Sequence, residues 1–321
     1  MNYKKLLNKL ICGGVICAAL TTGMNFAAAE VDFDPDKAIA HYTQKLQIDP
    51  NNAIMYNNRG VAYKMKEDYE KALADLTRAI ELDPTYADAY NNRGTVYSQV
   101  KMYKEAAADY SNAIRFEPNN AVAYNNRSVA NIMLGSDAGM KGNSSLHDSY
   151  YRKAVEDAAR AISLKANYED AYINRGRAYA ALEERKNAIN DFTKALDLNP
   201  NNPTIYSIRG ASYDAINRED LALADYTRAL ELDPNDGATY NNRGLIYMNR
   251  KEYNRAISDF TRALENSGEN AVFYNNRGVA YYAKRDYDSA IDDFNRALSI
   301  NPNFKAAIDN LKDALAAKGT R

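Results

Sequence analysis

The sequence predicts an all-α protein built as a solenoid of helix-turn-helix repeats. Three observations predict this fold: a five-residue motif occurs seven times, its copies are 34 residues apart with one exception, and small and apolar residues follow each copy at helical spacing. Self-similarity at such a period is typical of repeat architectures, in which each unit packs mainly on its neighbours. The usual expectation from length, about two domains of roughly 150 residues, therefore gives way to one elongated array.

The recurring motif is Tyr-Asn-Asn-Arg-Gly or a close variant of it. Its copies begin at Tyr56, Tyr90, Tyr124, Tyr172, Tyr206, Tyr240 and Tyr274. The third spacing is 48 residues, so the third repeat carries an insertion of fourteen residues, which we place at about 135–149. Because this segment is rich in Gly and Ser, we expect a flexible loop between the two helices of that repeat. Such a loop either contacts a partner or takes no part in binding.

A second pattern follows each motif and consists of Ala, a large apolar residue, Ala and usually Pro. In the first repeat these residues are Ala72, Leu76, Ala79 and Pro84. Spacings of three, four and seven mark one face of a helix, and small residues let two helices approach closely. Proline has no backbone N–H donor and ends the second helix. Each unit is therefore predicted to be a pair of antiparallel helices.

Together these patterns resemble the tetratricopeptide repeat, whose first helix carries Trp or Tyr, Leu, Gly and Tyr, and whose second carries Ala, Phe or Tyr, Ala and Pro. The resemblance covers residues 53–304 in seven repeats. It implies a right-handed superhelix whose first helices line a concave surface. We expect a linker and a lone second helix at 30–52, and a polar capping helix at 305–321. Ser128 and Asn131 depart from the pattern, so the third repeat should be the least regular.

Every repeat also carries an arginine at its seventh position and an aspartate on its second helix. The N-terminal half repeat has His41 at the aspartate position, and the cap has Leu311 at the arginine position. Each charge is thus absent where the partner in its own repeat is absent. This favours a clamp between the two helices of one repeat over a ladder of arginines for an anionic partner. The predicted clamp includes the pairs Arg59 and Asp75, Arg93 and Asp109, Arg243 and Asp259, and Arg277 and Asp293.

Asparagine fills the fifth and sixth positions of most repeats. A carboxamide both donates and accepts hydrogen bonds, so it can pair with the backbone of an extended peptide of any sequence. In peptide-binding members of the family that the chain resembles, the asparagine at the sixth position contacts the ligand backbone, and the resemblance implies the same here. The alternative is that these side chains serve only helix packing or solubility. The predicted peptide-binding residues of the concave face are Asn57, Asn58, Asn91, Asn92, Asn125, Asn126, Asn174, Asn241, Asn242, Asn275 and Asn276.

The composition argues against several other functions. The chain has 41 Lys and Arg against 42 Asp and Glu, so it has no basic surplus for a nucleic acid partner. With 2 Cys and 2 His, it lacks the residues of a Cys/His metal site. No nucleophile motif and no phosphate-binding glycine loop occurs. We therefore expect no enzymatic activity, no metal and no cofactor.

The first 29 residues have the pattern of a cleaved signal peptide. Lys4, Lys5 and Lys9 precede an apolar run at 10–20, and three alanines at 27–29 place the cut before residue 30. Both cysteines lie in this segment, and without its three lysines the chain keeps 38 basic against 42 acidic residues. The mature protein is thus expected to be exported, either to a bacterial periplasm or fully secreted, without a membrane span.

The sequence leaves two hypotheses for function. The first is a non-enzymatic scaffold of the cell envelope that binds proteins or peptides, holding an extended segment or a helix of a partner in the concave groove. The alternative is a structural subunit that docks by its outer surface in an envelope assembly and leaves the groove unused.

Overall fold

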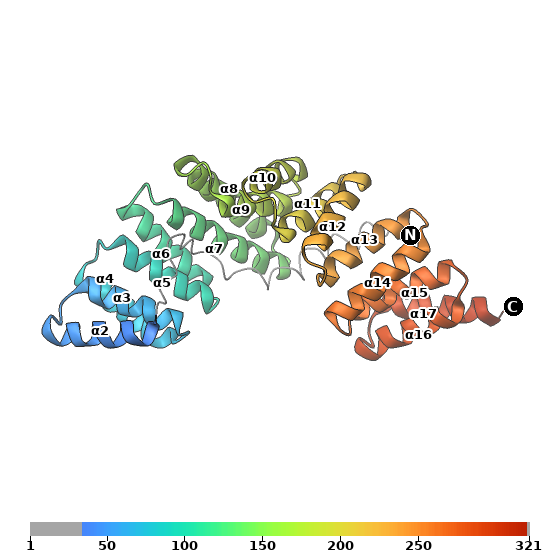
Figure 1. Ribbon diagram of the computed structural model, residues 1–321, viewed down its shortest axis with the longest axis horizontal. Helices are drawn as coiled ribbons and strands as arrows, with labels where there is room; N and C mark the ends of the chain where they lie inside the picture. Colours follow the sequence, from blue (N-terminus) through green and yellow to red (C-terminus); the bar gives the residue numbers. More distant parts are fainter. Residues whose placement is uncertain (1–33, 320–321) are drawn as a thin grey trace. The chain divides into compact units, whose positions relative to one another are not determined.

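The computed structural model describes residues 34–319, which form sixteen α-helices and no strand (Figure 1). The predicted signal peptide at 1–29 lies outside the described residues. After a single N-terminal helix, first and second helices alternate along the chain. In order they are α2 (Pro35–Ile48), α3 (Ala53–Met65), α4 (Tyr69–Leu82), α5 (Ala87–Gln99), α6 (Tyr103–Phe116), α7 (Ala121–Met140), α8 (Ser144–Leu164), α9 (Glu169–Ala181), α10 (Arg185–Leu198), α11 (Pro203–Ala215), α12 (Glu219–Leu232), α13 (Gly237–Asn249), α14 (Tyr253–Ser267), α15 (Ala271–Ala283), α16 (Tyr287–Ile300) and α17 (Lys305–Gly319).

The predicted fold class, an all-α solenoid of paired helices, is confirmed. The chain divides into two compact units, unit 1 up to Asp191 and unit 2 from Phe192, with the boundary inside α10. Unit 1 contains the N-terminal half repeat and repeats one to three, followed by the first helix of repeat four. Unit 2 contains repeats five to seven and the C-terminal helix. Each unit is described by itself below.

Within each repeat, a glycine on the first helix lets the second helix pack closely. A Cβ atom added at Gly244 would lie 2.8 Å from the ring of Phe260, which is fully buried. The small residues Ala256 and Ala263 flank this ring on α14 and are also fully buried. The apolar pattern found in the sequence therefore forms the contact between the two helices, at a separation that a larger residue at position 244 would not allow.

First helices of neighbouring repeats contact each other within each unit. In unit 1, α3 packs on α5, α5 on α7, and α7 on α9; in unit 2, α13 packs on α15 and α15 on α17. No two second helices of neighbouring repeats pack to this extent. The first helices therefore lie on the inner side of each stack. We call the surface formed by the fifth, ninth and twelfth residues of these helices, and the matching residues of α17, the inner face.

The insertion in the third repeat is helical, so the prediction of a flexible loop at 135–149 is wrong. Helices α7 and α8 have 20 and 21 residues, whereas α3 and α4 have 13 and 14. Each helix of the pair thus gains seven residues, close to two turns. Only Lys141, Gly142 and Asn143 lie between the two helices, and Gly142 adopts the positive φ of 75° that the tight turn requires.

The same insertion explains why the third repeat departs from the sequence pattern. Seven residues after Ser128 comes Gly135, where an added Cβ would lie 2.8 Å from the ring of Tyr151. Tyr151 in turn precedes Ala158 by seven residues. The close contact between a glycine and an aromatic ring has therefore moved along the helix pair by seven residues, and two small residues, Ser128 and Ala158, remain at its usual place. Both are fully buried.

The C-terminal helix α17 differs from the expected polar cap. It buries Ala307 and Ala314 against the last repeat, but Ile308 and Leu315 are 46% and 52% exposed. These two residues occupy the positions that, in a complete repeat, cover the following second helix. No second helix follows α17 in the described part of the chain, which explains their exposure.

In six repeats the turn between paired helices places a non-glycine residue in the left-handed region. These residues are Glu67, Lys101, Glu183, Asn217, Lys251 and Arg285, with φ between 60° and 66°. For most side chains this conformation is unfavourable because Cβ crowds the following carbonyl oxygen, whereas Asn tolerates it better. The fold therefore carries a small strain at nearly every turn.

We predict that Lys251→Gly stabilises the protein by about 0.5–1 kcal/mol, because glycine removes the left-handed strain at a partial cost in unfolded-chain entropy. Thermal unfolding monitored by circular dichroism measures the change. Asn217→Gly is the matched control and should have a smaller effect, since Asn already tolerates this conformation. A lower melting temperature for Lys251→Gly would contradict the prediction.

Candidate functional site

Each arginine at the seventh position forms a two-pronged ion pair with the aspartate of its own repeat. In repeat six, Nε of Arg243 donates to Oδ2 of Asp259 at 2.8 Å and its second terminal nitrogen donates to Oδ1 at 2.8 Å. The same arrangement joins Arg59 to Asp75, Arg93 to Asp109, Arg127 to Asp157, Arg175 to Asp191, Arg209 to Asp225 and Arg277 to Asp293. The side chains that the sequence predicts to form a clamp are thus brought together.

The remaining terminal nitrogen of the guanidinium bonds to the preceding repeat, which sequence reasoning missed. In Arg243 it donates to Oγ1 of Thr227 at 3.3 Å. The corresponding acceptors in other repeats are Thr43, Thr77, Ser111, Thr193 and Thr261. Their regular spacing could have revealed them. The arginine therefore joins neighbouring repeats as well as the two helices of its own.

One repeat interface lacks this second bond. Arg175 donates to Asp191 alone among the described residues, and Ala159 occupies the place of the hydroxyl residue in the preceding repeat. An alanine methyl group cannot accept a hydrogen bond. The interface between repeats three and four is therefore held by one hydrogen-bonded link fewer than its neighbours.

Tyrosine rings flank the guanidinium groups. The central carbon of Arg243 lies 5.6 Å from the ring centre of Tyr240 and 5.9 Å from that of Tyr247. Cation–π contacts of this length are favourable by about 0.5–2 kcal/mol, depending on solvation. In the third repeat Asn131 replaces the second tyrosine, and its amide donates to Asp157 at 3.2 Å. Many of the 26 tyrosines thus pack around the charge pairs.

The charge pairs are largely removed from solvent. Asp259 is 5% exposed, and its hydrogen bonds raise the pKa of Arg243 above its ordinary value. In the third repeat, burial raises the pKa of Asp157, although the hydrogen bonds from Arg127 and Asn131 act in the opposite direction. Because a carboxylate buried to this degree is costly without a cation, each arginine is needed by its partner and is not available to an anionic ligand.

The predicted peptide-binding asparagines form hydrogen bonds between repeats. The amide of Asn92, at the sixth position, donates to the carboxamide oxygen of Asn57, at the fifth position of the preceding repeat, at 2.9 Å. In unit 1 the series continues from Asn126 to Asn91 and from Asn174 to Asn125, and in unit 2 it runs from Asn276 to Asn241 and from Asn310 to Asn275. We call these bonds the asparagine ladder.

In repeats one, three, six and seven the asparagine at the fifth position is more buried than the one at the sixth, whereas Asn91 and Asn92 are both half-buried and Asn174 at a sixth position is 7% exposed. Fifth-position residues such as Asn57, Asn125 and Asn241 are 5–8% exposed. Asn58 and Asn242 at the sixth position are half-buried, and the oxygen of Asn58 accepts from the amide of Asn57 at 3.2 Å. The packing role weighed as an alternative is therefore visible in the structure. Each carboxamide has further donors and acceptors beyond those that the ladder uses, so a role in binding peptide backbone stays a prediction.

Sequence reasoning also missed Asn310, which extends the ladder onto the C-terminal helix. It follows Asn275 by 35 residues, the same interval that separates Asn57 from Asn92. The two units hold separate ladders. Ile173 and Ile208 carry no carboxamide, and at the start of unit 2 the hydroxyl of Ser207 instead pairs with that of Thr239 at 2.5 Å.

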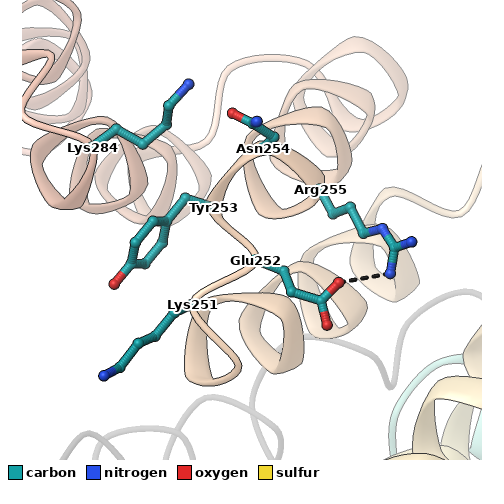
Figure 2. A pocket seen from close by; sticks show the side chains of 6 residues that line it. All are labelled: Lys251, Glu252, Tyr253, Asn254, Arg255 and Lys284. Atoms are coloured by element: carbon teal, nitrogen blue, oxygen red, sulfur yellow. Dashed lines mark hydrogen bonds and ion pairs between the residues drawn. The ribbon is translucent and has the colours of Figure 1, made fainter.

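In residues 34–319, the side chains do not gather into a metal site. A surface depression near the start of α14 is lined by Lys251, Glu252, Tyr253, Asn254, Arg255 and Lys284 (Figure 2). Its one carboxylate, Glu252, accepts from Arg255 at 2.6 Å, and it contains no His or Cys. Within the same range, no three His, Cys, Asp or Glu side chains are placed to share a metal ion. The helices described there also include none long and apolar enough to cross a membrane.

We predict that Arg243→Leu destabilises the protein by about 3–5 kcal/mol, because it leaves a buried carboxylate without its cation. Urea and thermal unfolding measure the change. The double variant Arg243→Met/Asp259→Leu removes both charges and should be less destabilised than the single variant. An unchanged melting temperature for Arg243→Leu would show that the pair does not clamp the helices.

Comparisons with known proteins agree with this architecture. Solved structures with a similar fold include the APC/C hetero-tetramer Cut9-Hcn1, at 22% identity and a TM-score of 0.59, where the alignment covers 88% of this chain and 52% of that one. A tetratricopeptide repeat protein from Parabacteroides merdae matches at 20% identity with a TM-score of 0.57, covering 87% and 99%. MamA from Desulfovibrio magneticus RS-1 matches at 18% identity with a TM-score of 0.50, covering 57% and 95%. At these identities the likeness shows the fold alone.

No curated protein sequence matches the chain significantly. A family model described as tetratricopeptide repeat matches residues 53–86, 87–120, 169–202, 237–270 and 271–304, and a second model of the same description matches 203–236. These segments leave out the third repeat, whose helices are lengthened. They cover more than half of the 321 residues, and the chain therefore belongs to the tetratricopeptide repeat family.

Proposed function

We propose that the protein is a non-enzymatic scaffold that holds a segment of a partner protein on the inner face of its repeats. The observation that carries the proposal is the different use of side chains along each first helix. The arginines and most asparagines are paired within the array, as described above. By contrast, apolar residues at the ninth position, such as Val61, Val129, Leu245 and Val279, are only half-buried. Accessible apolar side chains suit a polypeptide ligand when they lie beside carboxamides that have donors and acceptors beyond those of the asparagine ladder.

Membership of the tetratricopeptide repeat family supports a role in protein interaction. The fold also resembles a chain of the Cut9-Hcn1 hetero-tetramer, which is a protein assembly. The asparagine ladder contributes to the proposed site by fixing the positions of the carboxamides, so that a partner's backbone meets groups that are already ordered. Ordering before binding reduces the entropy lost when the complex forms.

A second candidate function is a structural subunit that docks by its outer surface. The observation that favours it is a set of exposed apolar residues at the ends of second helices. Ile48, Leu198 and Ile300 occupy equivalent positions and are 79%, 43% and 39% exposed. Exposed apolar side chains can mark an interface, although these three belong to separate repeats.

We predict that inner-face substitutions abolish partner capture while outer-face substitutions do not. The affinity-tagged chain is crosslinked in its host and purified, with Val129→Ser/Leu245→Ser as the inner-face variant. Leu221→Ser, on the second helix α12, where Leu221 is 48% exposed, is the control. Circular dichroism must show both variants folded. Loss of the same partner only from the control would favour docking by the outer surface.

We further propose that the protein acts in the cell envelope, in a periplasm or outside the cell. The support is the sequence of residues 1–29, with its basic start, apolar run and three alanines before Glu30. Fractionation of the host and N-terminal sequencing of the recovered chain test this. We expect the chain in the periplasmic or culture fraction, starting at Glu30. A cytoplasmic chain that keeps residues 1–29 would contradict the proposed location.

A further inference from the structure

We propose that Lys45 and Lys312 prevent copies of this chain from stacking end to end. This property is separate from the proposed binding of a partner protein. It concerns the two terminal helices of the described chain, α2 and α17, and a second copy of the same chain.

The two terminal helices are complementary halves of one repeat. Among the described residues, α2 is a second helix without a first helix before it, and α17 is a first helix without a second helix after it. If α17 of one copy packed on α2 of the next, the two would take the roles that α15 and α16 have in the last complete repeat. We call this the end-to-end contact. Because it joins two different surfaces of one molecule, it could extend from copy to copy without limit.

The free side of α17 keeps the apolar residues of a first helix. Ile308 and Leu315, which are 46% and 52% exposed, are equivalent to Tyr274 and Tyr281 of the last complete repeat. Tyr281 packs against the buried cluster that contains Phe294, a residue of its own second helix. The exposed pair on α17 therefore lies where a second helix would cover it.

The free side of α2 likewise keeps the pattern of a second helix. Ala38 and Tyr42 occupy the positions of Ala290 and Phe294. The latter two are fully buried in the last complete repeat, whereas Ala38 and Tyr42 are only half-buried. The apolar residues of the two ends thus match each other.

Neither end presents half of an arginine–aspartate pair. His41 is at the aspartate position of α2, and Leu311 is at the arginine position of α17. Leu311 packs against the cluster around Phe294 within its own chain. The end-to-end contact would therefore leave no buried aspartate without its arginine, and the apolar pattern alone would favour it.

Lys312 obstructs this contact on the side of α17. It occupies the position at which every complete repeat except the third has a glycine. A Cβ added at the equivalent Gly278 would lie 2.7 Å from the ring of Phe294. In the end-to-end contact, the Cβ of Lys312 and the rest of its side chain would meet the ring of Tyr42 at the same place. Helix α2 of a second copy therefore cannot approach α17 as closely as α16 approaches α15.

Lys45 obstructs the contact on the side of α2. The equivalent residues of all seven repeats are alanines that are at most 1% exposed, namely Ala79, Ala113, Ala161, Ala195, Ala229, Ala263 and Ala297. Tyr56, on the first helix of the same repeat, packs against the cluster that contains Ala79. In the end-to-end contact, the exposed Lys45 would face Ile308 in this way. A lysine is far larger than the methyl group that fits there, and its ammonium group would lose water.

The test is to remove both lysines and follow self-association. The purified chain and the variant Lys45→Ala/Lys312→Gly are compared by sedimentation velocity and light scattering over a range of concentrations. We expect the average mass of the variant at least to double as its concentration rises, whereas that of the unaltered chain stays constant. Lys37→Ala/Lys318→Ala is the matched control, because it removes one lysine from each of the same helices, and it should behave like the unaltered chain.

Mixing the single variants tests the direction of the contact. Lys312→Gly frees α17 but keeps Lys45 on α2, and Lys45→Ala does the reverse. Neither variant should associate alone. An equimolar mixture should form pairs that stop at two copies, because the outer ends of each pair still carry their lysines. This outcome distinguishes a contact between α17 and α2 from a general loss of solubility.

A constant average mass for the double variant, with unchanged helix content by circular dichroism, would overturn the proposal. Equal association of the control variant would do the same. So would oligomers of the unaltered chain that are lost in Ile308→Lys.

A second variant guards against damage to α17, because a glycine within a helix weakens it. Lys312→Ser/Tyr42→Ala/Lys45→Ala copies the small residues that the third repeat has at these positions, Ser128, Ala158 and Ala161. If Lys312→Gly lowers the helix content, this variant decides the question. It should associate, and a constant mass would count against the proposal.

Discussion

The stack of repeats depends on the guanidinium group of the seventh-position arginine. It is planar and has five N–H donors in a fixed arrangement. In repeat six it reaches Asp259 on the second helix and Thr227 in the preceding repeat, with Tyr240 and Tyr247 beside it. One side chain thus links the two helices of its own repeat to the repeat before. A lysine could not replace it, because a single ammonium group cannot present donors in these three directions at once.

The asparagine ladder adds a second set of links on the inner face. It joins each first helix to the next, as Asn276 does with Asn241, while the arginine joins a first helix to two second helices. Because the ladder joins first helices to each other and the clamp also reaches second helices, the two together fix both sides of the contact between neighbouring repeats. Under the proposed function, the inner face is ordered before a partner binds, and selectivity is expected from residues outside both networks, such as Leu245 and Tyr282.

The sequence was sufficient for the fold and for the pairing of each arginine with its aspartate, because both repeat every 34 residues. Three features escaped it for physical reasons. The hydroxyl acceptors such as Thr227 recur at a regular spacing, but they carry no charge, so the sequence pattern alone did not identify them as partners of the arginines. The ladder joins neighbouring repeats at an interval of 35 residues, or 49 across the insertion, so its partners are not equivalent positions. The glycines and serines of the third repeat suggested a loop, but Gly135 lies in a helix, where the absence of a side chain leaves room for the ring of Tyr151.

The third repeat shows how the helices of one repeat can become longer within a regular array. Seven residues span nearly two turns, about 10.5 Å of helix, so adding seven to each partner returns the chain to the same angular position. The arginine of that repeat still meets Asp157, although 30 residues rather than 16 separate them. Both helices of a pair can thus be lengthened by the same number of residues while the neighbouring repeats keep their contacts. The longer helix pair extends beyond the shorter pairs of its neighbours, and the arginine–aspartate contact within the repeat is kept.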